Sequence, residues 1–342
     1  MKKAVLTVNE KVVGNNAGPK AKVDEEFFLN HDGFKKLDIS LNVKSKWQKL
    51  LFVTFKLPKI LKELAEYDEI LFQYPTYSSF VMKYLIDGIK RNPKVKLFFL
   101  IHDVESLRLF KGQSNYWKGE SELFNATDGL IAHNRAMNEW LVENGVHVPI
   151  TNLEIFDYRN NFPVSSDSVY QKSICFAGNL NKAPFLSKLI LNDSKLHLFG
   201  PTKQEDYKKG VNYCGSFLPD DLPEHLTQNF GLVWDGSSLE RCDGTFGEYM
   251  KYNDPHKVSL YLSCGMPVII WENSAMAPFI KSNELGIVVN NLTHLDSKLT
   301  KLSQDEYSKM RNNCIKFSSK LRQGYFIKRA VASLEKVTEV EK

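Results

Sequence analysis

Short apolar segments alternate with longer helical stretches along all 342 residues of the chain. This alternation is typical of parallel sheets covered by helices, so we predict an α/β fold. In open sheets of this class ligands bind beyond the carboxyl ends of the strands, and candidate functional residues are therefore sought there. Eleven segments are predicted as strands: residues 4–8, 37–39, 69–73, 97–101 and 129–132 in the first half, and 173–177, 196–199, 211–213, 230–234, 267–271 and 286–289 in the second.

The chain is long enough for two domains, each with a core of its own. The stretch DYRNNFPVSSD, residues 157–167, is polar and lacks periodicity, so it is the predicted linker. The expected domains are residues 1–158 and 159–321. A final helical segment, 305–336, is long enough to pass back from the second domain, and the helix 322–342 is a candidate to pack on the first.

Composition excludes several classes of protein. Hydrophobic residues make up 43% of the chain and charged residues 25%, a globular balance, and no apolar run is long enough to span a membrane. The N-terminus lacks a long apolar region followed by a cleavage site, so a cytoplasmic protein is expected. The five cysteines are scattered and form no CxxC pair, which indicates neither a disulfide framework nor a zinc site. A formal charge of +5 is too small to indicate a nucleic-acid partner.

Residues 44–64, KSKWQKLLFVTFKLPKILKEL, interleave lysines with aromatic and aliphatic side chains. Such a segment is able to lie on an anionic bilayer surface. It is equally able to pack an apolar face on the sheet with its lysines outward, and we favour this second interpretation because every helix of an α/β domain needs such a face. Peripheral contact with the inner face of the plasma membrane therefore stays open, as does a homo-oligomeric state.

The stretch NDPHK, residues 253–257, precedes an apolar helical run that ends near Gly265. Asp254 is the predicted helix cap and Pro255 the predicted first helical residue. His256 and Lys257 then fall in the first turn, at the positive end of the helix dipole, where an anion is favoured and a cation is not. We therefore expect an anion to bind there. The plain alternative is a lysine that points into solvent.

Two other stretches carry residue types suited to a nucleotide diphosphate. In CFAGNLNKAPFL, residues 175–186, Gly178 and Asn179 form a turn after a strand, and Lys182 follows; any strand-to-helix turn favours glycine and asparagine, so this signal is weak alone. Phe217 lies in the polar stretch 213–226, where its ring is able to stack on a base or to serve as a core anchor. The chain has no GxxxxGK[ST], GxGxxG or Asp-x-Asp, so no metal is expected, and basic side chains would balance the diphosphate.

The segments FAGNLNK, GSFLPDD, LIHDVESLR with IAHN, and above all residues 230–271 resemble the bacterial β-1,6-galactofuranosyltransferases that build O-antigen and capsular polysaccharides. A looser similarity reaches the glucosyltransferases that extend sugars on serine-rich adhesins. The resemblance implies a GT-B fold, with two Rossmann-like domains whose parallel sheets face each other across a cleft. It also implies an acceptor bound mainly by the first domain and a UDP-sugar bound by the second, without a cofactor. Lys182, Phe217 and Lys257 match the family's nucleotide positions.

The resemblance implies transfer of a hexosyl group, with galactofuranose favoured, from a UDP-sugar to a hydroxyl of a lipid-linked or protein-linked glycan. Inversion at the sugar carbon and independence of metal are expected. One alternative is a UDP-glucose or UDP-N-acetylglucosamine transferase that extends glycans on a serine-rich adhesin. Another is a module that binds a nucleotide sugar without catalysis.

Inverting transfer needs a base near the acceptor hydroxyl. Asp103, which follows a predicted buried strand in LIHDVESLR, is the favoured base, although such an aspartate is also a common helix cap. His102 is the second candidate, because an ordinary imidazole transfers protons near neutral pH.

Three residues after the first strand, Asn15, Asn16 and Gly18, are predicted to meet acceptor hydroxyls, although an ordinary turn explains them almost as well. Glu272 follows the strand 267–271 and is predicted to meet hydroxyls of the donor sugar. A surface carboxylate is its plain alternative.

Overall fold

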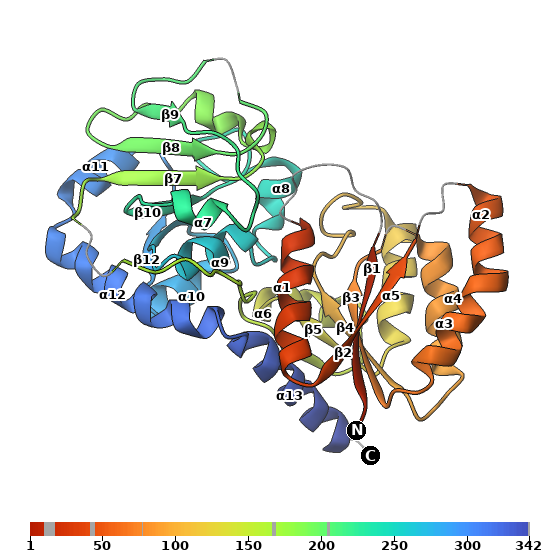
Figure 1. Cartoon of the computed structure of the whole chain (residues 1–342). Helices are drawn as coiled ribbons and strands as arrows, with labels where there is room; N and C mark the ends of the chain where they lie inside the picture. The colour runs from red at the N-terminus through yellow and green to blue at the C-terminus, as the bar shows by residue number, and fades with distance from the viewer. Residues whose placement is uncertain (10–17, 42–44, 77, 166–168, 204–205, 341–342) are drawn as a thin grey trace. The chain divides into compact units, whose positions relative to one another are not determined.

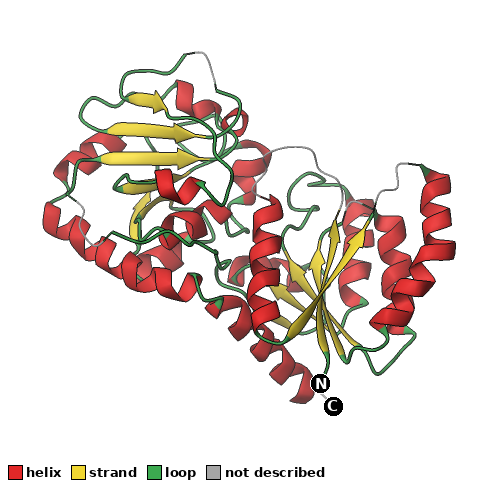
Figure 2. Cartoon of the chain, viewed as in Figure 1, coloured by secondary structure: helices red, strands yellow, loops and turns green. Residues whose placement is uncertain are grey.

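The computed structural model describes residues 1–9, 18–41, 45–76, 78–165, 169–203 and 206–340, and it contains two six-stranded sheets flanked by helices (Figures 1 and 2). Every strand pair in both sheets is parallel. The predicted α/β class is therefore confirmed. The chain divides into two compact units, Met1–Gly14 with Lys22–Leu153 and Ile327–Lys342, and Asn15–Ala21 with Glu154–Phe326.

The first unit holds the sheet with strand order β2-β1-β3-β4-β5-β6. Its central strands are almost wholly apolar and buried, as is usual where helices cover both faces of a parallel sheet. The strands are β1 (Lys3–Asn9), β2 (Phe34–Ser40), β3 (Glu69–Tyr74), β4 (Lys96–Ile101), β5 (Gly129–Ala132) and β6 (Ile150–Asn152). The helical elements are α1 (Gly18–His31), which belongs to this unit from Lys22 onward, α2 (Lys46–Leu51), the π-helical turn η1 (Phe52–Lys56), α3 (Leu57–Leu64), α4 (Ser79–Lys90), α5 (Ser114–Asn125) and α6 (Arg135–Glu143).

The second unit holds the sheet with strand order β12-β11-β10-β7-β8-β9. The strands are β7 (Ser173–Ala177), β8 (Lys195–Phe199), β9 (Val211–Tyr213), β10 (Phe230–Val233), β11 (Val268–Trp271) and β12 (Gly286–Val289). The helical elements are η2 (Leu180–Lys182), η3 (Pro184–Ser187), α7 (Leu222–His225), α8 (Gly244–Tyr249), α9 (His256–Ser263), α10 (Ala277–Ser282), α11 (Leu295–Lys301) and α12 (Gln304–Leu321).

The last helix, α13 (Tyr325–Val340), belongs to the first unit from Ile327 onward. There Lys3 forms an ion pair with Glu335, and Thr151 Oγ1 donates a hydrogen bond to the carbonyl of Ala330 at 3.3 Å. A side chain at Gly129 would meet Leu334 at 2.8 Å, so the glycine permits close packing of this helix. No helix among the described residues is long and apolar enough to cross a membrane.

All eleven predicted segments form strands, with differences only at their ends. Trp234, predicted to end a strand, lies one residue past β10. Strand β6 was not predicted, because a strand of three residues that includes Thr151 and Asn152 offers no apolar run. The parallel partner of β6 is β5, the strand before it in the chain, and the composition of residues 150–152 carries no sign of this pairing.

The prediction that segment 44–64 packs an apolar face on the sheet, with its lysines outward, is only partly correct. The favoured interpretation holds for α3, which buries Leu57 and Leu64. It is wrong for α2, which buries none of its residues. The apolar side chains Trp47, Leu50 and Leu51 of α2 face outward; of its two lysines, Lys46 is exposed and Lys49 is half-buried.

Candidate functional site

Four adjacent strands of the second sheet are each followed, within three residues, by a glycine with positive φ. These glycines, which we call the glycine edge, are Gly178 after β7, Gly200 after β8, Gly215 after β9 and Gly236 after β10. A side chain at Gly200 would place its Cβ 1.8 Å from the carbonyl oxygen of Gly178. Only glycine therefore lets the ends of β7 and β8 approach so closely.

The N–H of Gly178 is not available to an anion. It donates a hydrogen bond to the carbonyl of Phe199 at 2.9 Å, and the N–H of Gly200 donates to the carbonyl of Gly215 at 2.8 Å. The glycine edge thus supplies a backbone surface that a ligand can approach closely. A positive charge to bind an anion there has to come from side chains of other residues.

Helix α9 is fixed on this sheet by Tyr261. Its ring lies over Gly231 of β10, where any Cβ would come within 2.2 Å of ring atoms. The hydroxyl of Tyr261 accepts a hydrogen bond from the N–H of Ala177 at 2.8 Å and donates to the carbonyl of Leu232 at 3.4 Å. The buried tyrosine therefore ties α9 to both β7 and β10.

Lys257 lies one helical turn before Tyr261, on the same side of α9. Its Nζ is 2.8 Å from Oδ1 of Asp235 and 3.4 Å from the carbonyl of Trp234, and it lies 4.5 Å from the centroid of the Phe176 ring. The lysine side chain is 18% exposed, so the alternative of a solvent-facing lysine does not describe the structure. A cation with a carboxylate partner therefore lies where β7 and β10 end.

The predicted role of Asp254 as helix cap is wrong. Pro255 occupies the cap position, with φ −62° and ψ 123°, and α9 has no side-chain cap hydrogen bond. Because the proline keeps an extended backbone, the helix begins one residue later than predicted, and Asp254 is buried one residue before the cap.

His256 turns away from the glycine edge. Its ring centroid lies 5.0 Å from that of Tyr158 and 6.2 Å from that of Phe156. Burial lowers the pKa of the imidazole to about 3. His256 is therefore neutral near pH 7, and Lys257 supplies the positive charge of the first turn.

The turn after β7 places Asn179 and Lys182. Oδ1 of Asn179 accepts hydrogen bonds from the N–H of Asn181 and from Oγ1 of Thr202, both at 3.0 Å, so this side chain caps η2. The ammonium of Lys182 lies 4.0 Å from the centroid of the Phe246 ring in α8. The N–H of Gly236 donates to the carbonyl of Lys182 at 3.4 Å. Lys182 therefore lies beside the glycine edge, on the side of β10.

Phe217 follows β9 at the other end of the glycine edge. Its ring stacks on His225 with centroids 3.6 Å apart and planes inclined by 24°, and it lies 6.2 Å from Phe199. One face of the ring is thus covered by the histidine. A nucleotide base that stacked on Phe217 would use the other face of the ring or displace His225.

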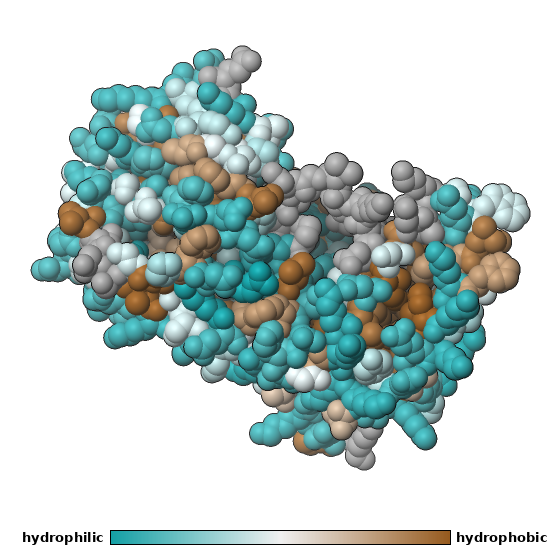
Figure 3. All heavy atoms as spheres, viewed as in Figure 1, coloured by the Kyte–Doolittle hydropathy of each residue, from teal (hydrophilic) through white to brown (hydrophobic). Residues whose placement is uncertain are grey.

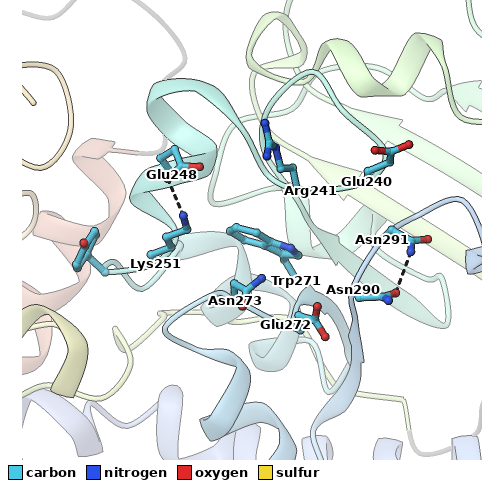
Figure 4. A pocket seen from close by; sticks show the side chains of 10 residues that line it. Glu240, Arg241, Glu248, Lys251, Trp271, Glu272, Asn273, Asn290 and Asn291 are labelled. Carbon is cyan, nitrogen blue, oxygen red and sulfur yellow. Dashed lines mark hydrogen bonds and ion pairs between the residues drawn. The ribbon is translucent and has the colours of Figure 1, made fainter.

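Glu272 lies apart from these residues, in a pocket of about 810 Å³ (Figure 4). The pocket opens beyond β11 and β12, and no other predicted donor residue lines it. Figure 4 shows the Trp271 ring between the ion pair Lys251–Glu248 and the amides of Asn290 and Asn291. Trp271 is only 3% exposed, so the pocket presents mainly amide and charged groups, which suit the hydroxyls of a ligand.

In the first unit, hydrogen bonds link the ends of three neighbouring strands. Nε2 of His133 donates to the carbonyl of His102 at 3.0 Å, and Nε2 of His102 lies 2.9 Å from Oε1 of Gln73. The amide nitrogen of Gln73 donates to Thr7 Oγ1 at 2.6 Å and to the carbonyl of Lys22 at 3.1 Å. Because a carbonyl only accepts, the amide oxygen of Gln73 has to face His102, whose Nε2 then carries a proton. Nδ1 is therefore the basic nitrogen of a neutral His102.

Asp103 lies just before a series of turns that begins at Glu105, and no helix starts there, so the alternative that it caps a helix at residues 104–105 is wrong. Its Oδ2 is 2.8 Å from Arg108, which also pairs with Glu105. The carboxylate of Glu120 in α5 accepts hydrogen bonds from the N–H groups of Glu105 and Ser106, both at 3.0 Å. The loop that carries His102 and Asp103 is thus held by an ion pair and by a buried carboxylate.

The predicted acceptor residues are only partly described. Asn15 and Asn16 lie outside the described residues, and Gly18 is the first residue of α1. In the described part of the chain no group of three or more His, Cys, Asp or Glu residues is placed to hold a metal ion.

Sequence reasoning missed Asp235, Gln73 and Glu120. Asp235 follows a predicted strand directly, and Gln73 is a polar residue at the end of an otherwise apolar strand, so both positions carried a signal. Glu120 gave none, because an acidic residue within a helix is ordinary.

Two domain models of one family match the chain, the N-terminal model over residues 3–155 and the C-terminal model over residues 174–334. The chain belongs to the glucosyltransferase 3-like family. As a member of this family the protein is a glycosyltransferase, and the prediction of an enzyme is confirmed.

Similar proteins confirm the suspected relationship. The β-1,6-galactofuranosyltransferase WbbI of Escherichia coli K12 is 29% identical over 89% of this chain and 94% of its own length. Glucosyltransferase 3 of Streptococcus gordonii is 27% identical over 83% of this chain and 84% of its own length.

Solved structures confirm the GT-B fold. HepE of Anabaena, in complex with UDP and glucose, matches with a TM-score of 0.61 at 10% identity, over 97% of this chain and 98% of its own. Sucrose-phosphate synthase of Thermosynechococcus elongatus matches with a TM-score of 0.64 at 11% identity, over 100% of both chains.

Proposed function

We propose that this glycosyltransferase moves a hexosyl group, with galactofuranose favoured, from a UDP-sugar to a hydroxyl of a glycan acceptor. The observation that carries the proposal is the position of Lys257, whose ammonium lies where β7 and β10 end beside the glycine edge. WbbI, a β-1,6-galactofuranosyltransferase, supports the choice of sugar, and HepE, which binds UDP and glucose, supports the choice of nucleotide.

In this proposal the diphosphate of the donor lies against the glycine edge. The ammonium of Lys257 has three N–H donors, and the described contacts with Asp235 and Trp234 use two of them. A phosphate oxygen takes the third, while Lys182 approaches from the η2 turn. These side chains neutralise the departing UDP, and no metal is needed for that step.

The reaction is proposed as one displacement with inversion. The acceptor oxygen forms a bond to the anomeric carbon as the bond from that carbon to the phosphate oxygen breaks, and UDP leaves with the electron pair. A base takes the proton of the acceptor hydroxyl. His102 and Asp103 are the two proposed bases; Nδ1 of His102 is buried in the structure, so the surrounding loop would have to move for this atom to reach an acceptor hydroxyl. Asp103 has an ion-pair partner in Arg108, whereas the tautomer of His102 is set by Gln73.

A second proposal keeps the chemistry and changes the substrates. The matching family models are named for glucosyltransferase 3, and the Streptococcus gordonii enzyme of that name is 27% identical. Transfer of glucose or N-acetylglucosamine from the UDP-sugar to glycans on a serine-rich adhesin is therefore the alternative.

The test is incubation of the protein with UDP-galactofuranose, UDP-glucose, UDP-galactose and UDP-N-acetylglucosamine in turn, with lipid-linked and protein-linked glycan acceptors. Transfer from UDP-galactofuranose with inversion, read by NMR of the product linkage, is expected. Transfer from UDP-glucose or UDP-N-acetylglucosamine alone would support the alternative. Binding of UDP without release from any donor would mean a binding module and would refute both.

A further inference from the structure

An apolar surface on α2 and η1 has no partner among the described residues of the chain. Four large side chains on it are exposed: Trp47 at 76%, Leu50 at 47%, Leu51 at 54% and Phe55 at 65%. Their spacing places them on one side of a helix. Figure 3 shows apolar residues gathered at the right-hand margin, where Figure 1 places α2. We call these four residues the outer face of α2.

The π-helical turn explains why this face points outward. In an uninterrupted α-helix, Val53 and Leu50 would continue the buried row of Leu57 and Leu64 toward the N-terminus. Instead the N–H of Leu57 donates to the carbonyl of Phe52, five residues earlier, and Phe52 becomes the next buried residue. The extra residue in this turn rotates α2, so its apolar side faces away from the unit.

Positive charge surrounds the outer face of α2. Residues 46–62 contain five lysines and no acidic residue. Four of these lysines are exposed and Lys49 is half-buried; the exposed ones are Lys46, Lys56, Lys59 and Lys62. The five lysines account for the whole formal excess of +5 on the chain. The rest of the protein therefore carries no net formal charge.

We propose that the outer face of α2 docks on the anionic surface of a lipid bilayer. Exposed tryptophan, leucine and phenylalanine side chains gain by entering the boundary between headgroups and acyl chains, and the lysines around them reach anionic headgroups. A second copy of this chain fits poorly, because it would bring the same lysines against one another. The proposal concerns where the enzyme works, so it holds or fails independently of the sugar that is transferred.

Co-sedimentation with vesicles tests the charge requirement. The full chain should bind vesicles of phosphatidylglycerol and phosphatidylcholine and should not bind phosphatidylcholine alone. Lys46→Gln with Lys56→Gln should weaken binding about fivefold for each lysine removed. Lys208→Gln with Lys209→Gln, at exposed positions of the second unit, is the matched control and should bind as the parent does. Absence of binding to the anionic vesicles would refute the proposal.

Insertion of the apolar side chains has its own readout. Brominated lipid should quench part of the tryptophan fluorescence of the parent, and Trp47→Phe should remove that quenching while the protein still binds. Leu51→Ser with Phe55→Ser should reduce binding at least tenfold, whereas Ile190→Ser with Leu218→Ser, also at exposed apolar positions, should not. Quenching that persists in Trp47→Phe would overturn the proposal. So would a concentration-dependent dimer that Leu51→Ser with Phe55→Ser dissolves, because a second copy would then cover this face.

Discussion

Nζ of Lys257 lies 2.8 Å from Oδ1 of Asp235, and both side chains are largely withdrawn from solvent where β7 and β10 end. The pair combines the charge proposed to hold a phosphate with a carboxylate that would repel one. Removal of the lysine should therefore weaken donor binding, and removal of the carboxylate should strengthen it.

Lys257→Ala should lower donor affinity and turnover together, by roughly tenfold to a hundredfold, because a charge-assisted contact of about 1.5–3 kcal/mol is lost and Asp235 remains. Isothermal titration with UDP and initial rates with the preferred donor measure the two effects. The matched control is Lys309→Ala, which removes a similar lysine from a surface pair with Glu284. If Lys257→Ala and Lys309→Ala behave alike, the phosphate site lies elsewhere.

Asp235→Asn should tighten UDP binding severalfold, because the ammonium of Lys257 loses its competing carboxylate while the amide keeps a hydrogen-bond acceptor. In the Lys257→Ala background the same substitution should recover part of the lost affinity, since it removes an unpaired negative charge near the phosphate. A double-mutant cycle by titration calorimetry measures the coupling. Weaker UDP binding in Asp235→Asn would show that this carboxylate serves the ligand directly.

His102→Gln and Asp103→Asn separate the two proposed bases. Loss of a general base costs about 10²–10⁴ in turnover, and loss of an imidazole base should also remove the acid limb of the pH–rate profile. We expect His102→Gln to show both effects. Gln73→Met should lower turnover less and leave UDP affinity unchanged, because Gln73 orients the imidazole in the first unit. If only Asp103→Asn loses turnover and the acid limb survives in His102→Gln, Asp103 is the base.

Acid should destabilise the fold through His133. Burial lowers the pKa of this histidine to about 3. Below pH 6.5 the unfolded chain takes up a proton that the folded chain refuses until about pH 3, so the free energy of unfolding should fall by about 1.4 kcal/mol per pH unit for such a group. Urea unfolding from neutral pH down to about pH 4.5 measures the slope. His133→Gln should flatten this slope, and His31→Gln, at an exposed histidine, should not. Equal slopes in both variants would contradict the assignment.

Gly200→Ala should lower the free energy of unfolding by about 1–3 kcal/mol or more, because a Cβ would strike the carbonyl of Gly178 and φ is +147°. The control is Gly112→Ala, where φ is +81° but no heavy atom lies within 4 Å of the added carbon. The difference between the two variants isolates the collision from the backbone strain. Urea denaturation measures both.

Activity should persist in excess chelator, since the proposed neutralisation of UDP uses lysine side chains and the sequence has no Asp-x-Asp. Initial rates with and without chelator are the measurement. Loss of activity that manganese restores would mean that a metal carries the diphosphate charge.

The strands were predictable because each is a short apolar segment bounded by polar or turn residues, and that pattern is local. The outward turn of α2 was not, because it depends on one extra residue in a π-helical turn that composition does not mark. The cap at Asp254 failed for a similar reason, since Pro255 is compatible with either a helical or an extended ψ.

The candidate site was predictable in part. Lys257 and Lys182 follow from glycine-rich strand ends and from a helix start. Their contacts with Asp235 and Phe246 could not be predicted. Asp235 reaches Lys257 through the parallel pairing of strands distant in sequence, and Phe246 reaches Lys182 through the packing of α8. The position of Gln73 carried a signal, but its contact with His102 depends on the pairing of β3 with β4, which local sequence does not show.

The ring of Tyr261 lies directly over Gly231, so the position of Lys257 at the strand ends depends on the absence of a Cβ at residue 231. Any side chain at position 231 would lift α9 from the sheet, because its Cβ would meet the ring at 2.2 Å. The helix would carry Lys257 with it, away from Asp235 and from the ends of β7 and β10. A mutation at this wholly buried glycine should therefore appear as a substrate-affinity defect in addition to a folding defect, and substitutions tolerated there would have to be matched by a smaller residue at 261.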